Sequence, residues 1–169
     1  MTNDQNLIET VREALESTAG QVAATWTMED TGYAPYQVMH LVKQGFVIIG
    51  EPVAEFEHQG DAEMLLKAPT LLSILADTLE AGKLDEDARG LLDEVNFILR
   101  TSSVSMDDEK KWEAEGPDDE VRYLTITNRG AKMVACDELY GETEDVEFIV
   151  NIPVWLRELS ERVQALPSV

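Results

Sequence analysis

The feature that most constrains the fold is an internal repeat. Residues 61–75 and 145–159 follow one pattern although they lie 84 positions apart. The identical positions are Asp61/Asp145, Glu63/Glu147, Pro69/Pro153, Leu72/Leu156 and Leu75/Leu159. The same offset aligns apolar residues at helical spacing in 7–20 and 91–104. A sequence repeat of this kind predicts two copies of one small structural unit.

Each copy of the repeat has the same expected order of elements. A helix is followed by a segment with one tryptophan, a hairpin around a glycine turn (KQG or NRG), and a second helix. The expected strand segments are the hairpins 36–49 and 121–134 and short further strands at 53–56 and 138–140. The sequence therefore predicts an α+β fold, a tandem duplication of an α-β-β(-β)-α unit with pseudo-two-fold symmetry. The repeats are expected to span 1–84 and 85–169 and to pack as one globular unit.

The ends of the second helix in each copy carry recognisable signals. Asp61 and Asp145 are predicted N-caps, because a short carboxylate can accept hydrogen bonds from free backbone N–H groups. Pro69 and Pro153 lack an N–H, so they predict a kink or a break in each helix. Gly82 predicts the end of the first of these helices.

The charge of the chain restricts its partners. It holds 34 acidic residues against 13 Lys and Arg, a formal net charge of −21. Both halves contribute, with 13 acidic and four basic residues in 1–84 and 21 and nine in 85–169. Such a field repels nucleic acid and anionic membranes and attracts basic surfaces. Its magnitude matches the charge on about 36 Å of DNA duplex, close to one helical turn.

The compartment follows from three absences in the sequence. No apolar run reaches the roughly 18 residues that a membrane span needs. The start of the chain, MTNDQNLIET, is polar and acidic, which is unlike a signal peptide. Cys136 is the one cysteine, so no intrachain disulfide can form. We expect a cytoplasmic protein with no membrane contact.

No pattern in the sequence indicates a catalytic or metal site. His40 and His58 are the two histidines, and neither belongs to a metal-binding motif. The acidic runs 85–87, 106–109 and 117–120 lack the ligand spacing of a calcium-binding loop. We expect no catalytic residues, no metal and no cofactor, and we expect that the protein is not an enzyme.

Part of the first half resembles a known family. The resemblance depends on Trp26, Val53, Ala54, Asp61, Ala62, Pro69, Leu71, Leu72 and Leu75. These residues, from the tryptophan to the leucine-rich helix, are similar to those of the Ead-like accessory proteins of bacteriophages and prophages. The Gly-Pro that usually precedes the tryptophan is replaced by Ala24–Thr25. The resemblance implies an origin in a phage or mobile element and transfers no catalytic residues.

The charge and the resemblance together predict a binding module. We expect an acidic accessory protein that binds and inhibits a basic, nucleic-acid-binding protein of the host cell by DNA mimicry. It would not bind nucleic acid itself, and its oligomeric state is left open. The expected partner-binding residues are Asp107, Asp108, Glu109, Trp112, Glu113, Glu115, Asp118, Asp119 and Glu120.

Two alternative functions fit the same sequence. The first is a binding or sequestering protein for a nucleotide-type small ligand, held in a cleft between the repeats. An anionic ligand would need cations there, and Arg122, Arg129 and Lys132 form the one basic cluster on the second hairpin. The second alternative is a virion or assembly component held by protein contacts.

Overall fold

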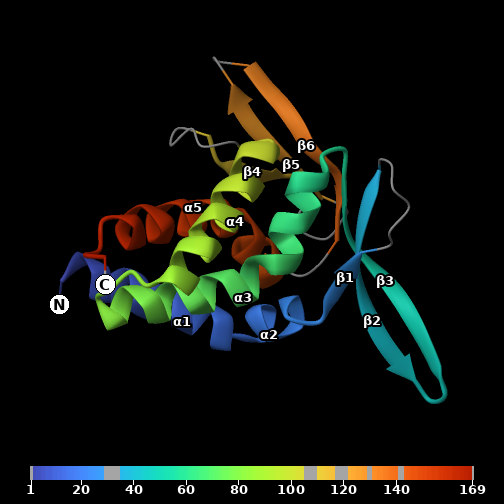
Figure 1. Ribbon diagram of the computed structural model, residues 1–169. Helices are drawn as coiled ribbons and strands as arrows, with labels where there is room; N and C mark the ends of the chain where they lie inside the picture. Colours follow the sequence, from blue (N-terminus) through green and yellow to red (C-terminus); the bar gives the residue numbers. More distant parts are fainter. Residues whose placement is uncertain are drawn as a thin grey trace.

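The computed structural model describes residues 2–28, 35–104, 110–116, 122–128, 131–140 and 143–168 (Figure 1). Its helices are α1 (Asn3–Glu16), α2 (Thr18–Ala23), α3 (Gln59–Ala81), α4 (Glu86–Thr101) and α5 (Thr143–Gln164). Its strands are β1 (Trp26–Met28), β2 (Tyr36–Gln44), β3 (Val47–Phe56), β4 (Trp112–Glu115), β5 (Arg122–Asn128) and β6 (Ala131–Leu139). The predicted α+β class is confirmed.

The strands form one antiparallel sheet in the order β1-β2-β3-β6-β5-β4. The first three strands and the last three are each neighbours in sequence, and the two groups join between β3 and β6. The pairs at this join are Ala54↔Leu139, Glu55↔Glu138 and Phe56↔Cys136. Because the join is narrow, the β2–β3 and β5–β6 hairpins extend past it on different sides of the molecule (Figure 1).

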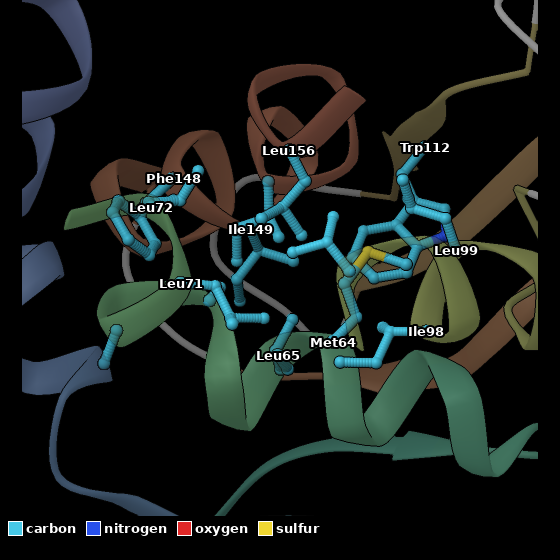
Figure 2. Packing of buried hydrophobic residues seen from close by; sticks show 14 of the residues in the cluster. Met64, Leu65, Leu71, Leu72, Ile98, Leu99, Trp112, Phe148, Ile149 and Leu156 are labelled. Atoms are coloured by element: carbon cyan, nitrogen blue, oxygen red, sulfur yellow. The ribbon is translucent and has the colours of Figure 1, made fainter. Parts of the chain in front are cut away.

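The helices cover one face of the sheet and enclose the core. Helix α3 packs against β1, β2 and β3 and also against α1, α4 and α5, while α5 packs against β4. Both halves contribute to one cluster of buried apolar residues. Figure 2 shows Leu65 and Leu71 of α3 facing Ile149 and Leu156 of α5 across this cluster. A single core therefore holds the layers together.

The expected short strands at 53–56 and 138–140 are not separate elements. The first is the end of β3 and the second continues β6 as far as Leu139. Gly50 and Pro52 interrupt the apolar run in the sequence, but Pro52 still pairs with Met39, next to a register shift between Val38 and Met39. The tryptophan segments form the edge strands β1 and β4.

Both prolines lie inside helices rather than at their ends. Pro69 is within α3 and Pro153 is within α5. Figure 1 shows that α3 changes direction along its length, as expected where a proline removes a backbone hydrogen bond. Gly82 ends α3 in the left-handed conformation with φ 69°, as predicted.

The predicted N-caps at Asp61 and Asp145 were wrong. The residue in the cap position of α3 is His58, and Asp61 is the third residue of the helix. Asp145 is likewise the third residue of α5, which begins at Thr143. The first turn of α3 lies close to the end of α4 at Gly60, which is buried there.

Candidate functional site

The structure describes five of the predicted site residues. Trp112, Glu113 and Glu115 belong to β4, Arg122 to β5 and Lys132 to β6. The others lie outside the described residues: Asp107, Asp108, Glu109, Asp118, Asp119, Glu120 and Arg129.

The prediction that Trp112 contributes to a partner surface was wrong. Its side chain is 2% exposed and stacks on Phe56, with 5.8 Å between the ring centroids. Figure 2 shows the indole beside Met64 and Leu99. The reason is its position in β4, where it points towards the helices and fills the core.

Glu113 and Glu115 form an ion-pair cluster rather than a bare acidic face. Lys132 forms an ion pair with Glu115, and its Nζ lies 4.0 Å from Glu113. Lys111 is 3.9 Å from Glu113, and the Tyr123 hydroxyl donates to Glu115 Oε2 at 3.1 Å. The hydrogen bond from Lys132 holds the pKa of the Glu115 carboxyl below its usual value. These acids are largely neutralised by their own chain.

The structure does not bring Arg122 and Lys132 together. Arg122 is 6% exposed, pairs with Leu139 and donates from Nη2 to Thr143 Oγ1 at 3.2 Å. Lys132 is exposed near the opposite end of the same hairpin, where it pairs with Thr127. The prediction that these two residues share a basic cleft was therefore wrong, because Arg122 is buried, Lys132 is exposed, and the two lie far apart along the strands.

An acidic groove that the sequence reading missed runs between α1 and the end of α3. Its volume is about 650 Å³. The acids that line it are Asp4, Glu9, Glu13, Glu16 and Glu80. Glu9, Glu13 and Glu16 are exposed, and none forms an ion pair within the described part of the chain. Their spacing on one helix face was a usable signal, since residues four and three apart are neighbours on a helix.

Many cations of the chain already bind its own carboxylates. Exposed ion pairs link the helices to one another at 2.7–2.8 Å. They are Arg12 with Asp77 and Glu80, Lys67 with Glu94, and Arg162 with Asp4. Exposed pairs of this kind contribute little to stability, because water and salt screen the charges. Arg12 itself lines the acidic groove, and two of the groove acids, Glu80 and Asp4, are paired in this way. The groove acids without an ion pair among the described residues are Glu9, Glu13 and Glu16.

Asp61 belongs to a group of four neighbouring residues, Phe56, Asp61, Ser103 and Trp112, that we call the closed constellation. Asp61 Oδ1 accepts from the Ser103 backbone N–H at 2.8 Å and from its hydroxyl at 3.0 Å. The Trp112 indole N–H donates to Ser103 Oγ at 3.2 Å. Asp61 Oδ2 is buried without a hydrogen-bond partner. Burial raises the pKa of the Asp61 carboxyl to about 6, although the two hydrogen bonds from Ser103 act against this shift.

A second, open arrangement of similar residues lies beside β1. This polar pocket has a volume of about 230 Å³. Its lining includes Trp26, His40, Glu51, Tyr140 and Asp145. Trp26 pairs with His40 and His40 with Glu51, so the three residues form one row across neighbouring strands. Residues paired in this way point to the same face of a sheet.

The outer part of the β2–β3 hairpin exposes apolar side chains. Phe46 is fully exposed, and Val47, Ile48 and Leu41 are about half exposed or more. Gly45 begins the two-residue turn with φ 63°, a conformation that favours glycine in tight hairpins. An apolar surface of this kind is typical of a protein contact.

The hairpin tip should be dispensable for folding. Replacing Phe46 by serine and Ile48 by threonine together is expected to change the free energy of unfolding by less than about 0.5 kcal/mol, because both side chains are exposed. Phe56→Ala, in the core, should cost about 3 kcal/mol or more. Urea denaturation measures both. A loss above 1 kcal/mol in the double variant would show that the tip packs against the body.

Comparison with known proteins gave no match to a family model, a curated protein or a solved structure. Within the described ranges, no three His, Cys, Asp or Glu side chains lie close enough to hold a metal ion. In the same part of the chain, no helix has the length and apolar character needed to cross a membrane.

Proposed function

We propose that this protein is a non-enzymatic, acidic accessory protein of a phage or prophage. It binds a basic, nucleic-acid-binding protein in the host cytoplasm and inhibits it by occupying the nucleic-acid site. The observation that carries the proposal is the acidic groove along α1. Its three unpaired carboxylates stand on a rigid helix in a chain of net charge −21.

The geometry of the groove suits imitation of a phosphate backbone. Along the helix axis, Glu13 lies about 6 Å from Glu9 and about 4.5 Å from Glu16. The phosphates of one DNA strand advance about 3.4 Å per nucleotide along the duplex axis. The row of carboxylates is therefore sparser than a DNA strand but similar in scale, and a row of basic side chains could bind it.

Competition with DNA tests this proposal. The immobilised protein should capture a basic protein from host lysate at low salt, and duplex DNA should displace that protein. Raising the salt from 50 to 200 mM should weaken capture about tenfold or more, because exposed charges are screened. A captured protein that duplex DNA does not displace, or the absence of any basic partner, would contradict the proposal.

Matched variants separate the groove from the net charge. Replacing Glu9, Glu13 and Glu16 by glutamine should abolish most of the capture. Replacing the exposed Asp87, Asp93 and Glu158 by their amides removes the same charge elsewhere and should have little effect. Equal losses in both variants would mean that only the net charge matters.

We also propose that the chain is a tandem duplication with pseudo-two-fold symmetry. The strand order places corresponding strands at equal distances from the β3–β6 join. In several pairs of residues 84 positions apart, both members are buried. Examples are Val11 and Val95, Leu72 and Leu156, and Leu75 and Leu159. The resemblance to Ead-like proteins in the first half is part of the same proposal.

The exposed hairpin favours a second candidate function, a virion or assembly component. In that case the protein would form oligomers through the β2–β3 tip, and the Phe46/Ile48 double variant would be smaller in size-exclusion chromatography with light scattering. An unchanged mass would contradict this candidate. The small-ligand alternative has no comparable support, since Arg122 and Lys132 lie apart.

A further inference from the structure

The polar pocket and the closed constellation occupy corresponding places in the two halves of the sheet. In each half, a tryptophan on the edge strand begins a row of paired residues across three strands. The rows are Trp26–His40–Glu51 and Trp112–Ile126–Met133. The second row is apolar by residue type, while the first row places an imidazole and a carboxylate beside the indole.

The residues that face these rows also correspond at an offset of 84. The pairs are Phe56/Tyr140, Asp61/Asp145 and Ser103/Ala19. In the closed constellation Phe56 stacks on Trp112, and Asp61 is fully buried against Ser103. In the other half, alanine replaces that serine and the aspartate is only half-buried, lining an open pocket with Tyr140.

The chemistry of the pocket favours a cation. The Trp26 side chain is 8% exposed, and its indole N–H has no hydrogen-bond partner among the residues that the structure describes. Glu51 is exposed and forms no ion pair within the same residues. Neither Lys nor Arg is among the described residues that line the pocket. Aromatic faces beside carboxylates attract ammonium and guanidinium groups and repel anions.

The size of the pocket limits what it can hold. Its volume of about 230 Å³ lies below the range of about 300–1,000 Å³ that is usual for small-molecule sites. It can hold the end of one side chain, and the Trp26 N–H remains available to a carbonyl oxygen of the same bound segment. We infer that this pocket receives an arginine or lysine side chain of the basic partner, and this inference rests on the proposed function.

Nuclear magnetic resonance of the full chain tests the pocket directly. The probes are acetyl-Gly-Arg-Gly-amide and the same peptide with citrulline, which is nearly isosteric with arginine but uncharged. The chain has three tryptophans, so its indole N–H signals can be assigned with single Trp→Phe variants. The arginine peptide should shift the Trp26 signal saturably, and the citrulline peptide should not. The Trp112 signal should stay fixed, because its N–H is buried and bonded to Ser103.

A matched pair of variants separates the pocket from the general charge. Glu51→Gln should weaken binding of the arginine peptide about tenfold, the size expected from losing one carboxylate beside an aromatic site. Glu158→Gln, an exposed change on α5 outside both the pocket and the acidic groove, removes the same charge and should change the affinity less than about twofold. Equal weakening in both variants overturns the inference, as does a Trp26 signal that does not move. A shift of the Trp155 signal alone would also overturn it.

The capture experiment distinguishes this inference from the proposed function. If Glu51→Gln captures the basic partner as well as the unchanged protein does, the inference that the pocket receives an arginine or lysine side chain is overturned. The proposed function then stands. If the arginine peptide binds at Trp26 but no DNA-displaceable partner is captured, the proposed function fails and a cation-binding pocket remains.

Discussion

Replacing Gly60 by alanine is expected to lower the free energy of unfolding by about 3 kcal/mol. A Cβ atom at this position would lie 2.4 Å from the Thr101 carbonyl oxygen and 2.5 Å from its carbon. Both atoms belong to the backbone, so no side-chain rotation can relieve the overlap. The first turn of α3 would have to move away from the end of α4, which would disturb the closed constellation at Asp61 and Ser103.

Gly90 provides a matched control for this substitution. It also lies in a helix, but a Cβ there would meet no atom within 4 Å. Gly90→Ala should therefore raise the free energy of unfolding by about 0.5–1 kcal/mol, since alanine is the better helix former. Urea denaturation of both variants measures the contrast. A Gly60→Ala protein as stable as the parent would mean that the α3–α4 contact is not closely packed.

Replacing Asp61 by asparagine is expected to raise the free energy of unfolding at pH 7 by about 2 kcal/mol. Asp61 is fully buried, and one of its carboxylate oxygens has no partner. Asparagine keeps an oxygen that can accept both hydrogen bonds from Ser103, and it removes the buried charge. The gain is smaller than the full cost of the charge because the asparagine NH₂ would also lack a partner.

Asp61 also makes the free energy of unfolding depend on pH, and the direction of this dependence follows from its pKa. Its pKa is raised from 3.8 to about 6, chiefly by burial. The folded protein therefore binds this proton more tightly than the unfolded chain does. As the pH falls from 7 through 6 towards 4, the contribution of Asp61 to stability rises by about 2 kcal/mol. Above pH 6 that contribution is lost.

The difference between the parent and the Asp61→Asn variant isolates this effect from the other carboxylates. The gap in unfolding free energy should be largest near pH 7 and should shrink steadily down to pH 4. Asp93→Asn, an exposed change on α4, should differ from the parent in unfolding free energy by nearly the same amount at every pH from 7 to 4. An Asp61→Asn variant less stable than the parent at pH 7 would show that the carboxylate is held by favourable contacts.

Local patterns predicted the elements of this fold well. Helical spacing in 7–20 and 91–104 located α1 and α4, and the glycine turn at Gly45 located the β2–β3 hairpin. These features depend on residues close together in the chain, so periodicity and turn chemistry suffice. The resemblance to Ead-like proteins stays a prediction.

The contacts between distant residues were not predictable in the same way. Nothing near Asp61 in the sequence indicates its contact with Ser103, and nothing near Gly60 indicates its close approach to Thr101 of another helix. Aromatic side chains are enriched at partner surfaces, which led to the prediction for Trp112, yet alternation along β4 turns the indole inwards. The acidic face of α1 was predictable from helical spacing, since Glu9, Glu13 and Glu16 lie four and three residues apart.

The narrow join between β3 and β6 has a consequence for the kinetics of folding. Within the described strands, every other pairing links neighbours in the chain, so each three-stranded group can zip up locally and fast. The entropy cost of closing a long loop falls instead on two contacts between distant parts of the chain. These are the three pairs of the join and the packing of α3 against α5. We therefore expect the meeting of the two partly formed halves to be the slow step of folding, and mutations at the β3–β6 join to change the folding rate.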